Sequence, residues 1–129
     1  MRRLVSISLF CFLFAAIAVH VHADGEKKVT IDHDRIYFGS PSSYKKPAVV
    51  NASAVFKEIP AYKQILKEKL TEKDPKYMIL IAEANQVFKK ALKKVYKDSG
   101  YDLIGEVGAI KIDGKDAPDV TSEAINAIE

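Results

Sequence analysis

Cysteine and tryptophan are nearly missing from this chain, which has one cysteine and no tryptophan in 129 residues. The single cysteine, Cys11, lies inside an apolar run at the N-terminus, so the remainder of the chain carries no thiol. Disulfide frameworks and cysteine-ligated zinc sites need several cysteines at defined spacings, and both are therefore excluded. The six glycines and five prolines are scattered, without a low-complexity tract or an internal repeat.

Catalytic motifs are also scarce. No glycine-rich phosphate loop, nucleophile elbow or paired-histidine motif occurs. Asp32, His33 and Asp34 form the only cluster with metal-ligand chemistry, but adjacent residues of a strand point to opposite faces, and no fourth ligand is evident. We therefore predict that the protein is not an enzyme and has no cofactor or metal. The alternative, an acid–base site around these three residues, would require further polar groups converging on one pocket.

The first 23 residues have the pattern of a secretory signal peptide. Arg2 and Arg3 precede an almost wholly apolar run from Leu4 to Val19, and Val21-His22-Ala23 offers a cleavage site. The alternative, a membrane anchor, is disfavoured because the run has about 16 residues where roughly 20 are needed to span a bilayer. Cys11 lies in the middle of the run, which argues against lipidation. We predict export to the periplasm, with secretion as the less favoured outcome and no stable membrane span after cleavage.

The remaining charges are nearly balanced but unevenly placed. Removing Arg2 and Arg3 lowers the formal net charge from +3 to +1, which gives no support for nucleic-acid binding. The segment from Tyr62 to Lys97 nevertheless contains ten lysines and only four acidic residues. Such a segment is either a solvated helix face or a surface that attracts acidic partners.

Hydrophobic periodicity predicts three helices in the middle of the chain. They are a short helix over 54–58, a helix over 60–70 that begins at Pro60, and a long helix over 75–98. Asn51 is placed to cap the first helix, which we favour over the alternative that Asn51-Ala52-Ser53 is a glycosylation sequon. Asp74 is placed to cap the third helix, and Gly100 to end it.

The long helix carries a heptad seam that we expect to be its core face. The seam residues recur at spacings of four and three and are Tyr77, Ile81, Ala84, Phe88, Ala91 and Val95, with Leu80, Val87 and Leu92 widening the stripe. Since about five polar residues join the second and third helices, the two are expected to run antiparallel.

Short β-like runs surround these helices. They cover 29–31, 35–38, 48–51, 103–107 and 109–112, and Asp119-Val120-Thr121 is placed to cap a closing helix. The fold class is therefore predicted to be α+β, a small β-sheet body interrupted by an antiparallel helical hairpin. The expected organisation is a signal peptide over 1–23, an N-terminal extension over 24–46, and one domain over 47–129 that contains the hairpin 54–99.

Several local strings resemble the Skp/OmpH family of periplasmic chaperones. The stretch 47–56 resembles the opening strand and short helix of that family, and Glu58-Ile59-Pro60-Ala61 its junction into the long helix. The family has strands near its C-terminus that are similar to Tyr101-Asp102-Leu103-Ile104 and to the run 108–112. The run 108–112 resembles the second strand of a hairpin there. Asp119-Val120-Thr121 resembles the start of its closing helix.

The resemblance implies a homotrimer whose strands form a central body and whose helical arms surround a cavity for unfolded outer-membrane proteins. Two departures stand out. The helical insert is about half the usual length of the family, and the segment 24–46 has no counterpart in it.

Two functional hypotheses follow from the resemblance. The first is an ATP-independent chaperone-like protein that binds unfolded outer-membrane or envelope proteins through its arms. The second is a non-catalytic structural or adaptor protein of the cell envelope with the same fold, which the short insert favours. The candidate client-binding residues are Tyr62, Lys63, Lys67, Tyr77, Lys89, Lys90, Lys93 and Lys94.

Overall fold

The fold consists of short strands at both ends of the chain and helices between them. The structure, a computed structural model, describes residues 27–129, and the predicted signal peptide lies outside the described residues. The elements are β1 (Val29–Ile31), the 3-10 turn η1 (His33–Arg35), β2 (Ile36–Phe38), β3 (Pro47–Val50), α1 (Ala52–Phe56), α2 (Pro60–Lys67), α3 (Pro75–Ser99), β4 (Leu103–Glu106), β5 (Ile110–Ile112), β6 (Lys115–Asp116) and α4 (Thr121–Asn126).

The first sheet joins the two ends of the helical insert. Its strand order is β2-β4-β3, and β3 runs parallel to β4 with Ala48 opposite Ile104. A connection between neighbouring parallel strands has to cross over the sheet, and here α1, α2 and α3 make that crossover. The prediction that the runs 48–51 and 103–107 share a sheet is thus confirmed. The outer edge of β3 is covered, because the Val49 amide donates to the Pro118 carbonyl at 2.9 Å.

The second sheet corrects the expectation of one small β-sheet body that contains both the run 103–107 and the run 109–112. Its order is β1-β5-β6, and β4 and β5 belong to different sheets. Gly108, at φ +87°, and a hydrogen bond from the Ala109 amide to the Glu106 carbonyl turn the chain directly after β4. Beyond this turn the Ala109 carbonyl accepts from the Asp32 amide at 2.7 Å, so β5 pairs with β1 instead.

The segment set apart as an N-terminal extension supplies two strands to the body. β1 pairs antiparallel with β5, with Val29 opposite Ile112, and β2 pairs antiparallel with β4, with Ile36 opposite Gly105. The β-like runs predicted at 29–31 and 35–38 are therefore strands. Both sheets thus combine strands from the beginning and the end of the described chain.

Local signals explain where the helices begin and end. The Asn51 side chain accepts from the Ala54 amide at 3.1 Å, so the predicted cap is confirmed, and α1 begins at Ala52 rather than at residue 54. Helix α2 begins at Pro60 as predicted. It ends at Lys67 rather than near Leu70, because Lys69 adopts a left-handed conformation with φ 52°.

The prediction for the C-terminal end of α3 is confirmed, and the prediction for its N-terminal end is wrong. Gly100 ends the helix as predicted, with φ 77° and its amide donating to the Tyr96 carbonyl at 2.8 Å. The predicted cap by the Asp74 side chain is wrong. That carboxylate accepts instead from the Thr71 amide at 2.8 Å, so it closes the turn before α3 rather than the helix itself.

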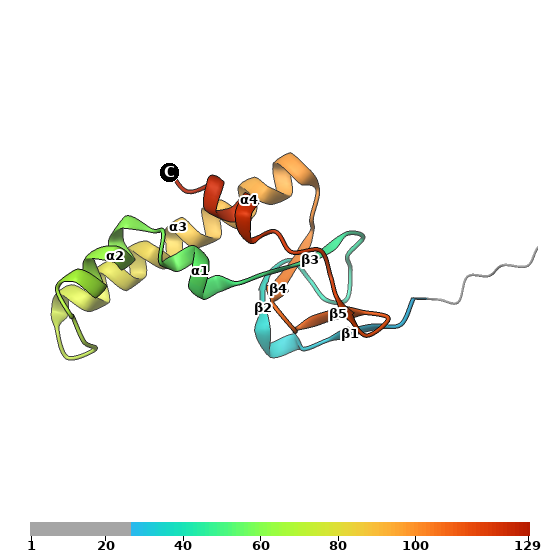
Figure 1. Ribbon diagram of the computed structural model, residues 1–129, viewed down its shortest axis with the longest axis horizontal. Helices are drawn as coiled ribbons and strands as arrows, with labels where there is room; N and C mark the ends of the chain where they lie inside the picture. Colours follow the sequence, from blue (N-terminus) through green and yellow to red (C-terminus); the bar gives the residue numbers. More distant parts are fainter. Residues whose placement is uncertain (1–26) are drawn as a thin grey trace, which may run out of the picture.

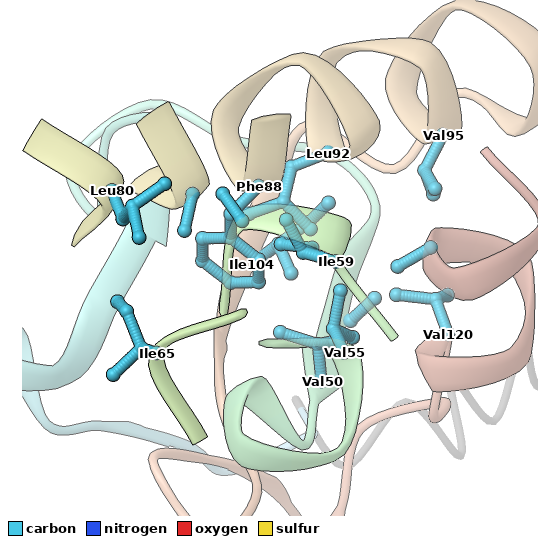
Figure 2. Packing of buried hydrophobic residues seen from close by; sticks show 14 residues of the cluster. Val50, Val55, Ile59, Ile65, Leu80, Phe88, Leu92, Val95, Ile104 and Val120 are labelled. Atoms are coloured by element: carbon cyan, nitrogen blue, oxygen red, sulfur yellow. The ribbon is translucent and has the colours of Figure 1, made fainter. Parts of the chain in front are cut away.

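The main core lies where α3 crosses the sheet. Of the predicted seam, Ala84, Phe88, Ala91 and Val95 are buried, whereas Tyr77 and Ile81 are half-buried. Figure 2 shows side chains of α3 gathered against residues of the sheet and the other helices; those labelled are Val50, Val55, Ile59, Ile65, Leu80, Phe88, Leu92, Val95, Ile104 and Val120. The seam therefore packs against the sheet and α4 as well as against α2.

A smaller core on the other face of the sheet completes the body. It contains Val49, Leu103, Ile110 and Ala117, all nearly inaccessible to solvent. Because β3 and β4 are buried on both faces, both read as continuous apolar runs, as expected of parallel strands. In Figure 1 the α2–α3 hairpin extends to one side of this body, and α4 lies beside the later part of α3.

Candidate binding surfaces of the helical arm

The interior of the body offers no polar site in the part of the chain that the structure describes. None of the buried residues between 27 and 129 is polar or charged, and no three His, Cys, Asp or Glu side chains gather there in a way that could hold a metal. Asp32, His33 and Asp34 are exposed, and the Asp32 carboxylate accepts from the Asp34 amide at 3.2 Å. Along residues 27–129 no helix combines the length and apolarity of a membrane span.

Three polar groups have shifted pKa values, and all three connect elements of the fold. Burial, together with the Tyr37 hydroxyl donating to Glu106 at 2.7 Å, raises the pKa of Tyr37 to about 12. The same Glu106 oxygen accepts from the Ala52 amide at the start of α1. This contact therefore ties β2, β4 and α1 together.

The other two groups are carboxylates. Burial alone would raise the pKa of Asp102, but hydrogen bonds from the Lys46 and Lys45 amides outweigh it and hold the pKa below its ordinary value. A hydrogen bond from Lys76 lowers the pKa of Glu68, with nitrogen and oxygen 2.8 Å apart at the closest. The first group joins the chain before β3 to the start of β4, and the second joins α2 to α3.

We call α2 and α3 together the helical arm. Of the candidate client-binding residues, Tyr62 and Tyr77 are half-buried on this arm and pack against the main core. The Tyr62 ring meets Phe56 edge-on, with ring centroids 5.7 Å apart. The rings of Tyr62 and Tyr77 thus stabilise the junction of α1, α2 and α3, and only part of their surface is open to a partner.

The candidate lysines divide into two groups. Lys63 and Lys67 are exposed on α2, and Lys63 forms an ion pair with Glu58 at 3.2 Å. Lys89, Lys90, Lys93 and Lys94 are exposed on the later part of α3. The structure brings three of this second group together around one hollow.

The hollow, which we call the lysine groove, lies between α3 and the segment after α4. It has a volume of about 340 Å³ and is lined by Val87, Lys90, Lys93, Lys94, Lys97, Ala127 and Glu129. Its four lysines follow the helical spacing of three and four that places residues on one face. The sequence-based prediction included three of them and missed Lys97, although the same spacing indicates it.

The lysine groove has a strong excess of positive charge. Lys94 pairs with Glu129 at 3.6 Å, whereas Lys90, Lys93 and Lys97 have no ion pair with any residue of 27–129. A neighbouring hollow of about 300 Å³, also bordered by Lys94, contains Asp98 and Glu123. Lys94 therefore borders both the positively charged groove and a hollow that contains acidic side chains.

Large apolar side chains are exposed where α2 ends and α3 begins. Leu66 exposes 52%, Met78 58% and Ile79 68% of its surface. We call these three residues the apolar arm end. Leu66 follows the apolar spacing that starts at Val55 and so is expected in the core, but α2 buries Ala61 and Ile65 instead. Met78 and Ile79 lie off the buried stripe of α3.

The described residues thus offer two candidate binding surfaces, the lysine groove and the apolar arm end. Comparison with family models, curated proteins and solved structures found no match to the chain, so these comparisons assign it to no family.

Proposed function

We propose that the protein is an ATP-independent, chaperone-like protein of the periplasm that holds unfolded outer-membrane or envelope proteins on its helical arm. The observation that supports this most is the apolar arm end. Exposed leucine, methionine and isoleucine side chains lose unfavourable contact with water when an apolar segment covers them. Unfolded chains present such segments, whereas folded soluble proteins mostly bury them.

The lysines of the arm suit the same task. Their aliphatic stems add apolar contact area, and their charges keep an exposed apolar surface soluble. The element order, a strand followed by a helical hairpin and a parallel partner strand, is in keeping with the resemblance to Skp/OmpH chaperones. We further propose that the protein is a homotrimer, because several weak sites on one particle hold a chain more tightly than one site.

Aggregation of a denatured outer-membrane protein, diluted with and without the mature protein, tests the proposal. Suppression is expected near equimolar ratios. The double variant Met78→Ser/Ile79→Ser is expected to lose most of it, because the apolar contact area is removed. The matched control, Asn85→Ser/Gln86→Ser, changes two exposed polar residues of the same helix and should keep full activity.

The second candidate function, a non-catalytic adaptor of the cell envelope, is favoured by the shortness of the arm. Helix α3 has 25 residues, or about 38 Å at ~1.5 Å per residue, and much of it packs against the body. Failure to suppress aggregation at a several-fold molar excess would contradict the chaperone proposal and favour the adaptor. Equal suppression by both double variants would contradict the role of the apolar arm end.

A further inference from the structure

We infer that the lysine groove is a second binding site, separate from the apolar arm end, and that it takes acidic segments of a polypeptide. The groove presents Lys90, Lys93, Lys94 and Lys97 on one face of α3. Three of these four have no ion pair with another residue in 27–129. Like charges held close together repel, so an anionic occupant lowers the electrostatic energy of this face.

One carboxylate of the chain itself lies beside the groove and gives an example of a fitting anion. The Glu129 carboxylate lies 3.6 Å from the Lys94 amine at the border of the groove, and Ala127 contributes to its wall. A glutamate side chain after α4 thus already pairs with one of the four lysines, although it stays largely exposed to solvent. The other three lysines can pair with the carboxylates of a second, incoming chain.

The shape and lining of the groove also favour a peptide. Its volume of about 340 Å³ exceeds what a single small anion fills, and it lies at the lower end of the range for binding pockets. Val87 and Ala127 provide apolar surface between the charges, which suits the aliphatic parts of a polypeptide. No aromatic ring of residues 27–129 lines it, so this part of the chain gives it no platform on which a nucleobase could stack.

The neighbouring hollow limits the direction in which an acidic chain can lie. Asp98 and Glu123 border that hollow beyond Lys94, and they repel further carboxylates. An acidic segment therefore lies along the four lysines of the groove, between Lys97 and Lys90, rather than in that hollow. Lys90 is the end of the groove that lies nearer to the beginning of α3, where the apolar arm end is.

Fluorescence anisotropy with the mature protein and a labelled eight-residue peptide of alternating glutamate and isoleucine tests the inference. Binding is expected in low salt and should weaken at least tenfold between about 50 and 200 mM NaCl, as charge pairing requires. The same peptide with glutamine in place of glutamate should bind at least tenfold more weakly. Equal binding of both peptides would overturn the inference.

Charge-reversal variants locate the site. Lys93→Glu/Lys97→Glu is expected to weaken peptide binding at least tenfold. Lys111→Glu/Lys115→Glu changes the net charge equally at two exposed residues outside the helical arm and should weaken binding less than threefold. Removing the internal competitor with Glu129→Gln should strengthen binding severalfold. Equal losses in the two double variants would show that only net charge matters and would overturn the inference.

Two further measurements distinguish a peptide site from a membrane-binding surface and from the apolar arm end. Peptide binding should shift the amide resonances of Val87 and Ala127 in the unaltered protein, which requires no variant to fold. A different pair of results would overturn the inference: the protein binds phosphatidylglycerol vesicles through Lys93 and Lys97, and the peptide does not shift the resonances of Val87 and Ala127. The partner would then be a membrane surface. The variant Lys93→Glu/Lys97→Glu leaves the apolar arm end intact. Aggregation assays on this variant therefore test the chaperone proposal separately from the inference that the lysine groove binds acidic segments.

Discussion

Tyr37 combines a hydrogen bond, an aromatic contact and a raised pKa in one side chain. Its hydroxyl donates to Glu106, and its ring meets Phe88 of α3 edge-on with centroids 5.3 Å apart. One side chain thus joins strand β2 to β4 and to the long helix. Because it is 40% exposed, we expect a moderate contribution to stability from its hydrogen bond.

Replacing Tyr37 by phenylalanine is expected to lower the free energy of unfolding by about 1 kcal/mol at pH 8, through loss of this hydrogen bond. The pKa of Tyr37 is raised in the folded state, to about 12 from its ordinary value of 10. The stabilisation is therefore complete below pH 10 and is lost as the pH rises through 12. Urea unfolding of both proteins at pH 8 and pH 11 measures this difference.

The control for this experiment is Tyr96→Phe. Tyr96 packs against Phe38, but in the described part of the chain its hydroxyl makes no hydrogen bond. Its replacement should leave stability within about 0.5 kcal/mol of the parent at either pH. A Tyr37→Phe difference that stayed constant up to pH 11 would contradict the assigned contact with Glu106.

At the scale of elements, the end of α2 contains an unusual residue choice. The Leu70 amide donates to the Ile65 carbonyl and the Lys69 amide to the Leu66 carbonyl, the two hydrogen bonds of a Schellman motif. Glycine normally occupies the left-handed position of this motif, and here Lys69 does, with φ 52°. A side chain in this conformation costs free energy that glycine does not.

Lys69→Gly is therefore expected to stabilise the protein by about 0.5 to 1 kcal/mol, and Lys67→Gly, two residues earlier in the helical part of α2, to destabilise it by a similar amount. Thermal unfolding of the two variants measures both effects. Opposite signs are the expected result, and destabilisation by both substitutions would contradict the helix end described for α2.

The helices were more predictable than the sheets because their signals are local. Pro60 and Gly100 mark a beginning and an end by their own backbone preferences, and Asn51 acts within its own turn. The pairing of β5 with β1 depends on residues about 80 positions apart, and a short turn with Gly108 is equally typical of a hairpin. Sequence periodicity alone does not choose between these partners.

The lysine groove was partly predictable for the same reason. Lys90, Lys93 and Lys94 were selected from the charge pattern of one helix, which is local information. The opposite wall, with Ala127 and Glu129, depends on how the chain after α4 returns to α3. That return follows from packing of Val120 and Ala124 into the main core, which no single segment reveals.

For the whole molecule, the two sheets leave strand edges to be covered. Among residues 27–129, β1 pairs only with β5 and β2 only with β4, so each has one edge without a strand partner. Exposed edges promote association with other strands. Together with the proposed function, this leads us to predict a homotrimer.

Light scattering of the mature protein at several concentrations measures the oligomeric state. The expected mass is three times that of the mature chain, and the midpoint of thermal unfolding should rise with protein concentration, because association stabilises the folded subunits. A stable monomer at all concentrations, with a constant midpoint, would contradict the trimer and weaken the case for a chaperone.

The parallel pairing of β3 with β4 has a consequence for how such an arm can vary. The crossover requires only that the chain leave one end of β3 and return to the other end of β4. The later part of α3 anchors in the main core through Phe88, Leu92 and Val95 and leads through Gly100 into β4. Whole heptads added at the turn between Lys67 and Pro75 would lengthen the hairpin outward while the strand register stayed the same. The length of the helical arm and the pairing of the strands are therefore independent in this architecture, and either can be altered alone.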